Sequence, residues 1–173
     1  MLESSGMPYM LTGSYASAVH GTPRATQDID IVIGPSRAQL ATLLEQLPDT
    51  AYYVSREAAL DALARRSQFN VIDFETGWKV DFIMVKAREF SREELRRRRA
   101  IEVDGVPLYV ASAEDVVIAK LEWAKLGSST RQLEDVAGIV RMQAEQLDRA
   151  YVERWVTELG LSPQWSEALI KAS

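Results

Sequence analysis

Two short apolar segments near the start of the chain constrain its fold more than any other feature. The first covers residues 9–12 and runs directly into the pair Gly13-Ser14. The second follows after a short connection and carries Asp28 and Asp30, with a single residue between them. Because the side chains of a strand alternate between its two faces, these two carboxylates project from the same face. Two carboxylates held side by side repel each other unless a cation lies between them.

A divalent metal ion bound through oxygen ligands explains this pair of aspartates. The alternative is that both side chains lie on the solvated face of an ordinary strand. Aspartate is depleted in strands, however, and the flanking Ile29 and Ile31 indicate a strand that is buried. The solvated-face interpretation also leaves the preceding Gly-Ser pair unexplained. We therefore predict that Asp28 and Asp30 bind a metal ion.

A third aspartate interrupts a later apolar segment. Residues 69–74 and 78–85 are predicted to form two strands joined by a hairpin turn, and Asp81 lies in the second of them. A carboxylate in the middle of a buried strand needs a partner. Lys79 lies on the same face of that strand and offers one, through an ion pair.

These features together resemble the nucleotidyltransferase superfamily of DNA polymerase β. The residues that carry the likeness are Gly13-Ser14, the motif Arg24-x-Thr26-x-Asp28-Ile29-Asp30, and the later strand with its third aspartate. The sequence looks most like the small bacterial nucleotidyltransferase-like proteins, which include abortive-infection and toxin–antitoxin members. The resemblance covers about residues 9–142. It implies an α/β fold with a mixed β-sheet flanked by helices in residues 1–111, and a helical C-terminal part in residues 112–173.

The resemblance also implies an activity. It is the transfer of a nucleotidyl group from a nucleoside triphosphate such as ATP to a hydroxyl of a tRNA, a protein or a small molecule. Asp28, Asp30 and Asp81 would be the catalytic residues and would hold Mg²⁺ or Mn²⁺. Asp81 takes the place of the family's third carboxylate, Asp73 is a weaker rival for that place, and an ion pair with Lys79 is the alternative for Asp81.

Four further residues are expected to contact the nucleotide. Gly13 and Ser14 would seat its phosphates, because the N-terminus of a helix after a tight turn offers free N–H groups and a positive potential. Taken alone, the pair is better explained as an ordinary connection from strand to helix. Arg24 and Lys120 would contact phosphate, and their alternatives are a solvated loop cation and an ion pair between Lys120 and Asp135.

Composition excludes several other classes of protein. The chain has 173 residues, 47% of them hydrophobic, so it can bury a real core. It has no cysteine and a single histidine, which excludes a disulfide framework and a multi-histidine zinc site within one chain. Its net charge of −5 argues against a generally basic coat for nucleic acid. We find neither a signal peptide nor a membrane-spanning apolar run, and we expect a cytoplasmic protein.

Two alternative functions stay open at this stage. A catalytically weak transferase fold could act as an antitoxin or another partner-binding module, which would show as an apolar patch on the C-terminal helices. A nucleic-acid-binding protein could use the basic run Arg96–Arg99, which we expect on a helix that begins at the capping box Ser91-x-x-Glu94.

Overall fold

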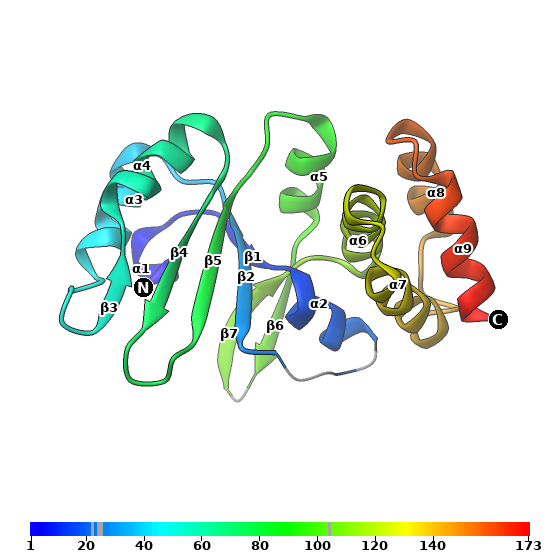
Figure 1. Ribbon diagram of the computed structural model, residues 1–173, viewed down its shortest axis with the longest axis horizontal. Helices are drawn as coiled ribbons and strands as arrows, with labels where there is room; N and C mark the ends of the chain where they lie inside the picture. Colours follow the sequence, from blue (N-terminus) through cyan, green and yellow to red (C-terminus); the bar gives the residue numbers. More distant parts are fainter. Residues whose placement is uncertain (22, 24–25, 104) are drawn as a thin grey trace. The chain divides into compact units, whose positions relative to one another are not determined.

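The computed structural model describes residues 1–21, 23, 26–103 and 105–173. Arg24, predicted to contact phosphate, therefore lies outside the described residues. The chain divides into two compact units, which are coloured along the sequence in Figure 1. The first unit comprises Met1–Thr12 and Thr26–Val110, and the second comprises 13–25 and Ala111–Ser173. The second unit thus includes the segment after the Gly-Ser turn as well as the C-terminal helices.

One mixed sheet, formed by seven strands of the described residues, organises the first unit. The strands lie in the order β3-β4-β5-β2-β1-β7-β6. Their bounds are β1 (Tyr9–Leu11), β2 (Asp28–Ile33), β3 (Tyr52–Val54), β4 (Gln68–Asp73), β5 (Lys79–Met84), β6 (Arg99–Val103) and β7 (Val106–Val110). β4 and β5 pair antiparallel and so form the predicted hairpin, whose turn contains Gly77 at a φ of 71°. β2 pairs parallel with β5 and antiparallel with β1.

The main core of the first unit lies on one face of this sheet. The helices of this unit are α1 (Leu2–Ser5), α3 (Arg37–Glu45), α4 (Arg56–Arg65) and α5 (Glu89–Arg97). α3 begins at Ser36, which forms a capping box with Gln39. Its apolar stripe, which includes Leu43, packs on Ile31 of β2 and Phe82 of β5. Since Asp30 and Asp81 each precede one of these core residues, they project from the opposite face.

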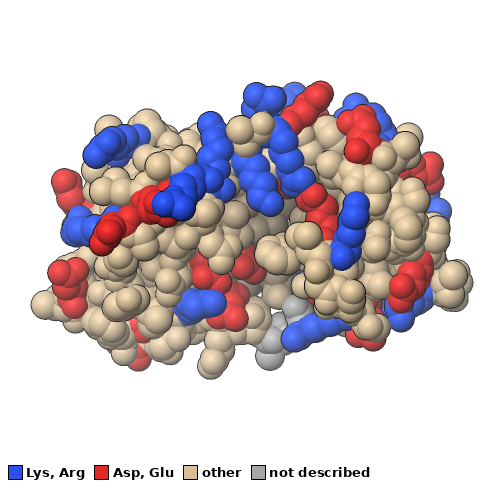
Figure 2. All heavy atoms as spheres, turned by 45° about the horizontal axis from the view of Figure 1, so that its top comes forward, with Lys and Arg blue, Asp and Glu red and all other residues tan. Residues whose placement is uncertain are grey.

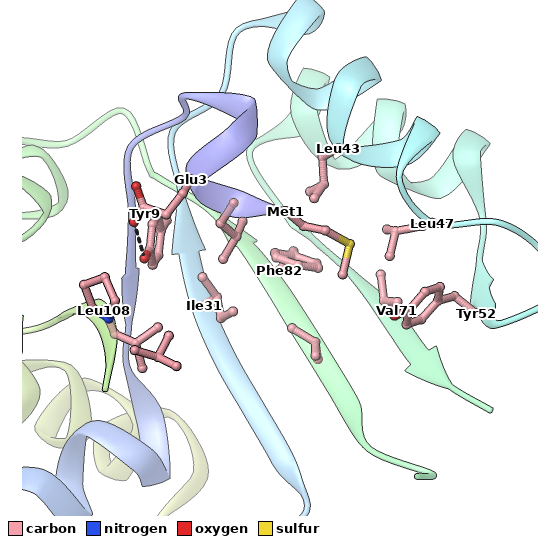
Figure 3. A pocket seen from close by; sticks show the side chains of 14 residues that line it. Met1, Glu3, Tyr9, Ile31, Leu43, Leu47, Tyr52, Val71, Phe82 and Leu108 are labelled. Atoms are coloured by element: carbon pink, nitrogen blue, oxygen red, sulfur yellow. Dashed lines mark hydrogen bonds between the residues drawn. The ribbon is translucent and has the colours of Figure 1, made fainter. Parts of the chain in front are cut away.

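A cavity of about 340 Å³ lies on this core face, where α1 and α3 cover the sheet (Figure 3). Its lining is mostly apolar and includes Ile31, Leu43 and Phe82. Its polar side chains include Tyr9, whose hydroxyl donates a hydrogen bond of 2.7 Å to Glu3. Burial, followed by the bond to Glu3 and its negative charge, raises the pKa of Tyr9 to about 12.

α5 differs from its sequence-based prediction. It begins at Glu89, so Ser91 is not its cap; Ser91 is buried and accepts a hydrogen bond from Arg88 Nε at 3.0 Å. The earlier start places Phe90 in the core with 1% of its surface exposed. The helix ends at Arg97 and Arg99 already belongs to β6, so the four arginines do not share a helix. Burying one aromatic side chain outweighs a capping box, because it removes far more apolar surface from water.

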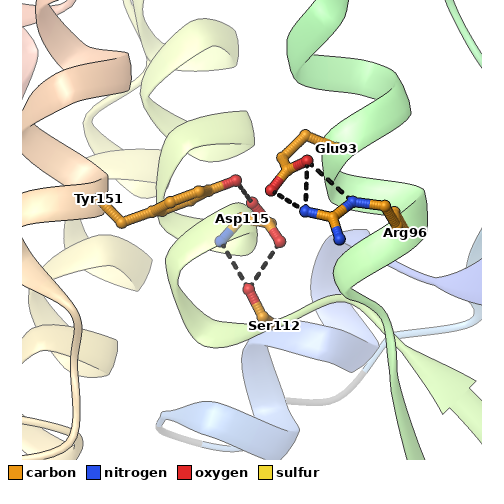
Figure 4. A network of polar contacts seen from close by, with 5 residues as sticks. All are labelled: Glu93, Arg96, Ser112, Asp115 and Tyr151. Atoms are coloured by element: carbon orange, nitrogen blue, oxygen red, sulfur yellow. Dashed lines mark hydrogen bonds and ion pairs between the residues drawn. The ribbon is translucent and has the colours of Figure 1, made fainter.

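Basic side chains gather around α5 on the face shown in Figure 2, with acidic ones among them. Within α5, Arg96 pairs with Glu93 at 2.7 Å, and Figure 4 draws this ion pair. Arg98 lies over the ring of Tyr109, with its Cζ 4.7 Å from the ring centre. The basic run is therefore partly engaged in contacts within its own unit.

The second unit is helical. Its helices are α2 (Gly13–His20), α6 (Ala113–Gly127), α7 (Thr130–Met142), α8 (Arg149–Glu158) and α9 (Ser162–Ala172). α6 is the central helix, since it contacts each of the other four. Val117, Ile118 and Leu121 of α6 are completely buried. The ring of His20 shares a hydrogen bond of 2.7 Å with the carbonyl of Ala111 within this unit.

A buried hydrogen-bond network fixes the start of α6 (Figure 4). Ser112 accepts a hydrogen bond from the backbone of Asp115 and donates its hydroxyl to the Asp115 carboxylate at 2.7 Å. Tyr151 of α8 donates to the other carboxylate oxygen, also at 2.7 Å. Asp115 is only 1% exposed, so these bonds replace the water that its charge would otherwise require. Across the described ranges, no helix has the length and apolar character that a bilayer crossing requires.

Candidate active site

The parallel pairing of β2 and β5 brings the three predicted catalytic carboxylates to one face of the sheet. Asp30 pairs in register with Asp81, and Asp28 pairs with Lys79. Neighbouring strands lie about 4.8 Å apart, and paired residues project from the same face. Asp28 and Asp30 share that face because they are two residues apart on one strand. The predicted meeting of Asp81 with the other two aspartates is therefore present in the first unit.

The backbone around Asp28 and Asp30 is held on both sides. The N–H of Asp28, at the start of β2, donates to the hydroxyl of Thr26 at 3.2 Å. The N–H of Thr12, just after β1, donates to the carbonyl of Asp30 at 2.9 Å. Further along β2, Ile31 and the two residues after it are buried. The strand is thus anchored by its apolar end, and the aspartates extend from the fixed part toward solvent.

Lys79 lies among the three carboxylates. Its ammonium nitrogen is 2.9 Å from an oxygen of Asp81 and 3.5 Å from an oxygen of Asp28. The hydrogen bond to Asp81 is the largest of the effects that raise the pKa of Lys79, and together they outweigh its partial burial. The ion pair that the sequence offered as the alternative for Asp81 therefore exists, and it includes Asp28 as well.

The chemistry of these donors fits a divalent metal ion. Three carboxylates on one sheet face supply the hard oxygen ligands that Mg²⁺ and Mn²⁺ prefer. As their side chains lie, though, no group of three or more His, Cys, Asp or Glu among the described residues is arranged to hold a metal ion. Instead, the ammonium of Lys79 bridges Asp28 and Asp81. The donor set is suitable, and its side chains would have to move to converge on one ion.

Gly13 and Ser14 begin the second unit. Gly13 is the first residue of α2 and has a φ of 60°, which a residue with a side chain rarely adopts. It directly follows Thr12, the residue bonded to the backbone of Asp30. A glycine is therefore favoured at this turn for conformational reasons, and phosphate binding by the pair stays a prediction.

Lys120 forms the ion pair with Asp135 that the sequence offered as the alternative to a phosphate contact. It is 4% exposed, and its ammonium donates to Asp135 at 2.6 Å and to Gln132 at 3.1 Å, which links α6 to α7. A phosphate contact would require the ammonium to leave the part-buried Asp135 carboxylate. The ion pair between Lys120 and Asp135 is thus present, and the role of Lys120 in nucleotide binding stays a prediction.

The structure also brings a residue to the site that the sequence analysis missed. Asn70 of β4 pairs with Asp81 across the hairpin and therefore projects from the same face. The sequence carried one signal for this residue, since the amide of Asn70 lies between two apolar residues of a strand, Phe69 and Val71, which are both buried. Asp73, the weaker rival for the third carboxylate, instead accepts hydrogen bonds from Glu75 and Thr76 in the turn. These bonds, chiefly the one from the Thr76 backbone, lower the pKa of the Asp73 carboxyl.

No protein-family model matches this chain, and no curated protein matches it either. Solved structures do share its fold. The antibiotic-resistance factor ANT(2'')-Ia in solution is 14% identical with a TM-score of 0.57, and the match covers 95% of this chain and 88% of that one. An antigenic nucleotidyltransferase-like protein from Paracoccidioides brasiliensis is 16% identical with a TM-score of 0.57, over 98% and 87%. The lincosamide antibiotic adenylyltransferase LnuA, lincomycin-bound, is 12% identical with a TM-score of 0.51, over 79% and 88%.

These matches establish the class of fold. The chain has the nucleotidyltransferase-like α/β fold, with a mixed sheet flanked by helices, and the fold predicted from the sequence is thereby confirmed. Sequence identities this low establish the fold alone.

Proposed function

We propose that this protein is a nucleotidyltransferase, which moves a nucleotidyl group from a nucleoside triphosphate to an acceptor hydroxyl. The observation that carries the proposal is the pairing of Asp30 with Asp81 on the sheet face that also holds Asp28. Three carboxylates on one face repel one another and destabilise the fold unless they bind a cation. The adenylyltransferase LnuA, which shares the fold, supports nucleotidyl transfer as the type of reaction.

Each site residue has a role in this proposal. Asp28, Asp30 and Asp81 hold the divalent ion, Mg²⁺ or Mn²⁺, which neutralises triphosphate charge and assists in-line displacement when bound. Asp81 also takes the proton from the acceptor hydroxyl, the role thought to belong to the family's third carboxylate.

The phosphates require separate contacts. Gly13 and Ser14 bind them at the start of α2, where the positive end of the helix dipole favours an anionic group. Arg24 and Lys120 supply positive charge. Lys120 can do so only by giving up its bond to Asp135.

The acceptor is a hydroxyl of a tRNA, a protein or a small molecule. ANT(2'')-Ia and LnuA are described as acting in antibiotic resistance and on a lincosamide antibiotic, which favours including small molecules in the search. The sequence resemblance to toxin–antitoxin proteins favours including tRNA and protein in the search. It also leads us to propose a toxin or antitoxin protein as a binding partner.

A labelling experiment tests the proposal. The purified protein is incubated with Mg²⁺, each α-³²P-labelled nucleoside triphosphate in turn, and a cell extract split into tRNA, protein and small-molecule fractions. Label should appear in one fraction with the wild type and disappear with Asp30→Asn. Asp49→Asn is the matched control, since it removes an exposed carboxylate elsewhere in the first unit. Equal labelling by wild type and Asp30→Asn would exclude these carboxylates as the catalytic set.

One observation favours a second candidate, a catalytically weak transferase fold that binds a partner. Lys79 already neutralises part of the acidic cluster, so the cluster can persist without a metal ion. In that case neither divalent metal nor triphosphate should bind the wild type detectably in calorimetry. Binding of both, lost in Asp28→Ala with Asp30→Ala, supports the enzyme instead.

A further inference from the structure

We infer that Lys79 is an internal cation that occupies part of the metal site while the protein is metal-free, and that its ammonium must leave before a divalent ion binds. The inference deepens the proposed function and rests on it. Lys79 then competes with the divalent ion and lowers the affinity of the site for it. An ion pair with only a structural role would leave that affinity unchanged.

Strand register places Lys79 in this position. It lies two residues before Asp81 on β5, on the same face, and directly opposite Asp28 on β2. Its nitrogen is within 2.9 Å of one carboxylate and 3.5 Å of the other. An ion that binds through both carboxylates must lie close to the same point, because its oxygen ligands are only slightly more than 2 Å away. The ammonium and the metal ion therefore compete for the same oxygens.

The exposures of the side chains indicate which group moves. Lys79 has 38% of its side chain exposed, whereas Asp81 has 17%. A lysine on a flexible stem can swing its ammonium into water at little cost. The aspartate is short and fixed to a paired strand, so its carboxylate can make only small adjustments. Once the ammonium leaves, the divalent charge opposes its return, since like charges at this range repel.

Two consequences follow for the metal-free protein. Lys79 contacts two of the three mutually repelling carboxylates, so its loss should destabilise the first unit when no metal is present. Its loss should also remove a competitor, so metal should bind more tightly. These effects have opposite signs, and this separates competition from general damage to the fold.

The test compares wild type with Lys79→Met, which keeps the length of the side chain and removes its charge. Mn²⁺ binding is measured by titration calorimetry, and thermal unfolding is measured in EDTA and in saturating Mn²⁺. We expect Lys79→Met to bind Mn²⁺ about tenfold more tightly, the scale of effect of a unit charge close to a titrating group. Its midpoint of thermal unfolding should fall below that of the wild type in EDTA and recover in saturating Mn²⁺. Lys86→Met is the control, since Lys86 is an exposed lysine of the same unit just beyond the other end of β5.

A second measurement follows the ammonium itself in the wild type. Reductive methylation with formaldehyde is quantified by mass spectrometry, residue by residue, with and without Mg²⁺. Lys79 should react faster when Mg²⁺ is present, because its nitrogen is then released from Asp81, and Lys86 should react at the same rate in both.

The outcomes separate this inference from the proposed function. If the wild type binds Mn²⁺ through Asp30 but Lys79→Met binds equally or more weakly, the competition is refuted and the enzyme proposal stands. If neither the wild type nor Lys79→Met binds Mn²⁺, both fail. If Lys79→Met alone gains affinity and Lys86→Met does not, the inference is supported.

Discussion

Asp30 of β2 lies directly opposite Asp81 of β5, in the parallel pairing of the two central strands. The two residues are far apart in the chain, and only the register of the sheet brings them together. Like charges placed opposite each other destabilise a sheet. Lys79 offsets that cost within the first unit through its contacts with Asp81 and Asp28. The acidic cluster is thus maintained by the chain itself and is accessible to a stronger cation.

The first prediction concerns Asp81. Asp81→Asn should lower the rate of nucleotidyl transfer by at least about 100-fold, because even the outer partners of metal ligands are each worth 10- to 100-fold. Its stability in EDTA should fall little, since the amide keeps the volume and the neighbouring charges lose a repulsive partner. Rates come from the labelling assay and stability from urea unfolding. Normal turnover in Asp81→Asn would remove Asp81 from the catalytic set.

The second prediction separates the two interpretations of Lys120. Lys120→Met leaves the part-buried Asp135 without its cation, which should cost up to about 3–5 kcal/mol in the free energy of unfolding. The double variant Lys120→Met with Asp135→Leu should recover most of that loss, because it leaves no unpaired buried charge. Urea unfolding measures both variants. Unchanged stability of Lys120→Met, together with weaker triphosphate binding, would instead support the nucleotide contact.

The third prediction concerns the network at the start of α6. Tyr151→Phe removes the hydroxyl that donates to the buried Asp115 carboxylate. Leaving that acceptor with one bond fewer should cost about 1–3 kcal/mol. Tyr53→Phe is the control, since Tyr53 is 53% exposed and should change little. Equal unfolding midpoints for the two variants would show that the network adds no stability.

The fourth prediction is a pH dependence that arises at Tyr9. Its pKa rises from 10.0 in the unfolded chain to about 12 in the fold. Between these values the unfolded state loses its proton first, so stability is fully present below pH 10 and falls as the pH rises toward 12. The total loss should be at most about 3 kcal/mol, since each of the two pKa units corresponds to about 1.4 kcal/mol.

Tyr9→Phe provides the comparison for that pH dependence. Its urea-unfolding free energy should decline less steeply than the wild type between pH 9.5 and the alkaline limit of folding, because it lacks the titrating hydroxyl. Parallel curves for the two proteins would show that Tyr9 does not titrate differently in the fold.

Local predictions succeeded where local chemistry decides. The hairpin predicted from residues 69–74 and 78–85 is present as the antiparallel pair β4 and β5. The prediction failed at Ser91, where burial of Phe90 moved the start of the helix. A side chain's tertiary environment is not encoded in a four-residue pattern, and apolar burial outweighs a cap.

The sequence by itself determined which residues carry charge within apolar strands, and the alternation of strand side chains put Asp28 and Asp30 on one face. It also raised the ion pairs of Lys79 and Lys120 as alternatives without deciding them. Only the tertiary structure decided that Asp81 meets Asp30, that Lys79 reaches both Asp81 and Asp28, and that Lys120 is buried against Asp135. The physical reason is that strand order, register and helix packing are set by contacts between distant segments, while a residue's type and spacing fix only what its own segment can do.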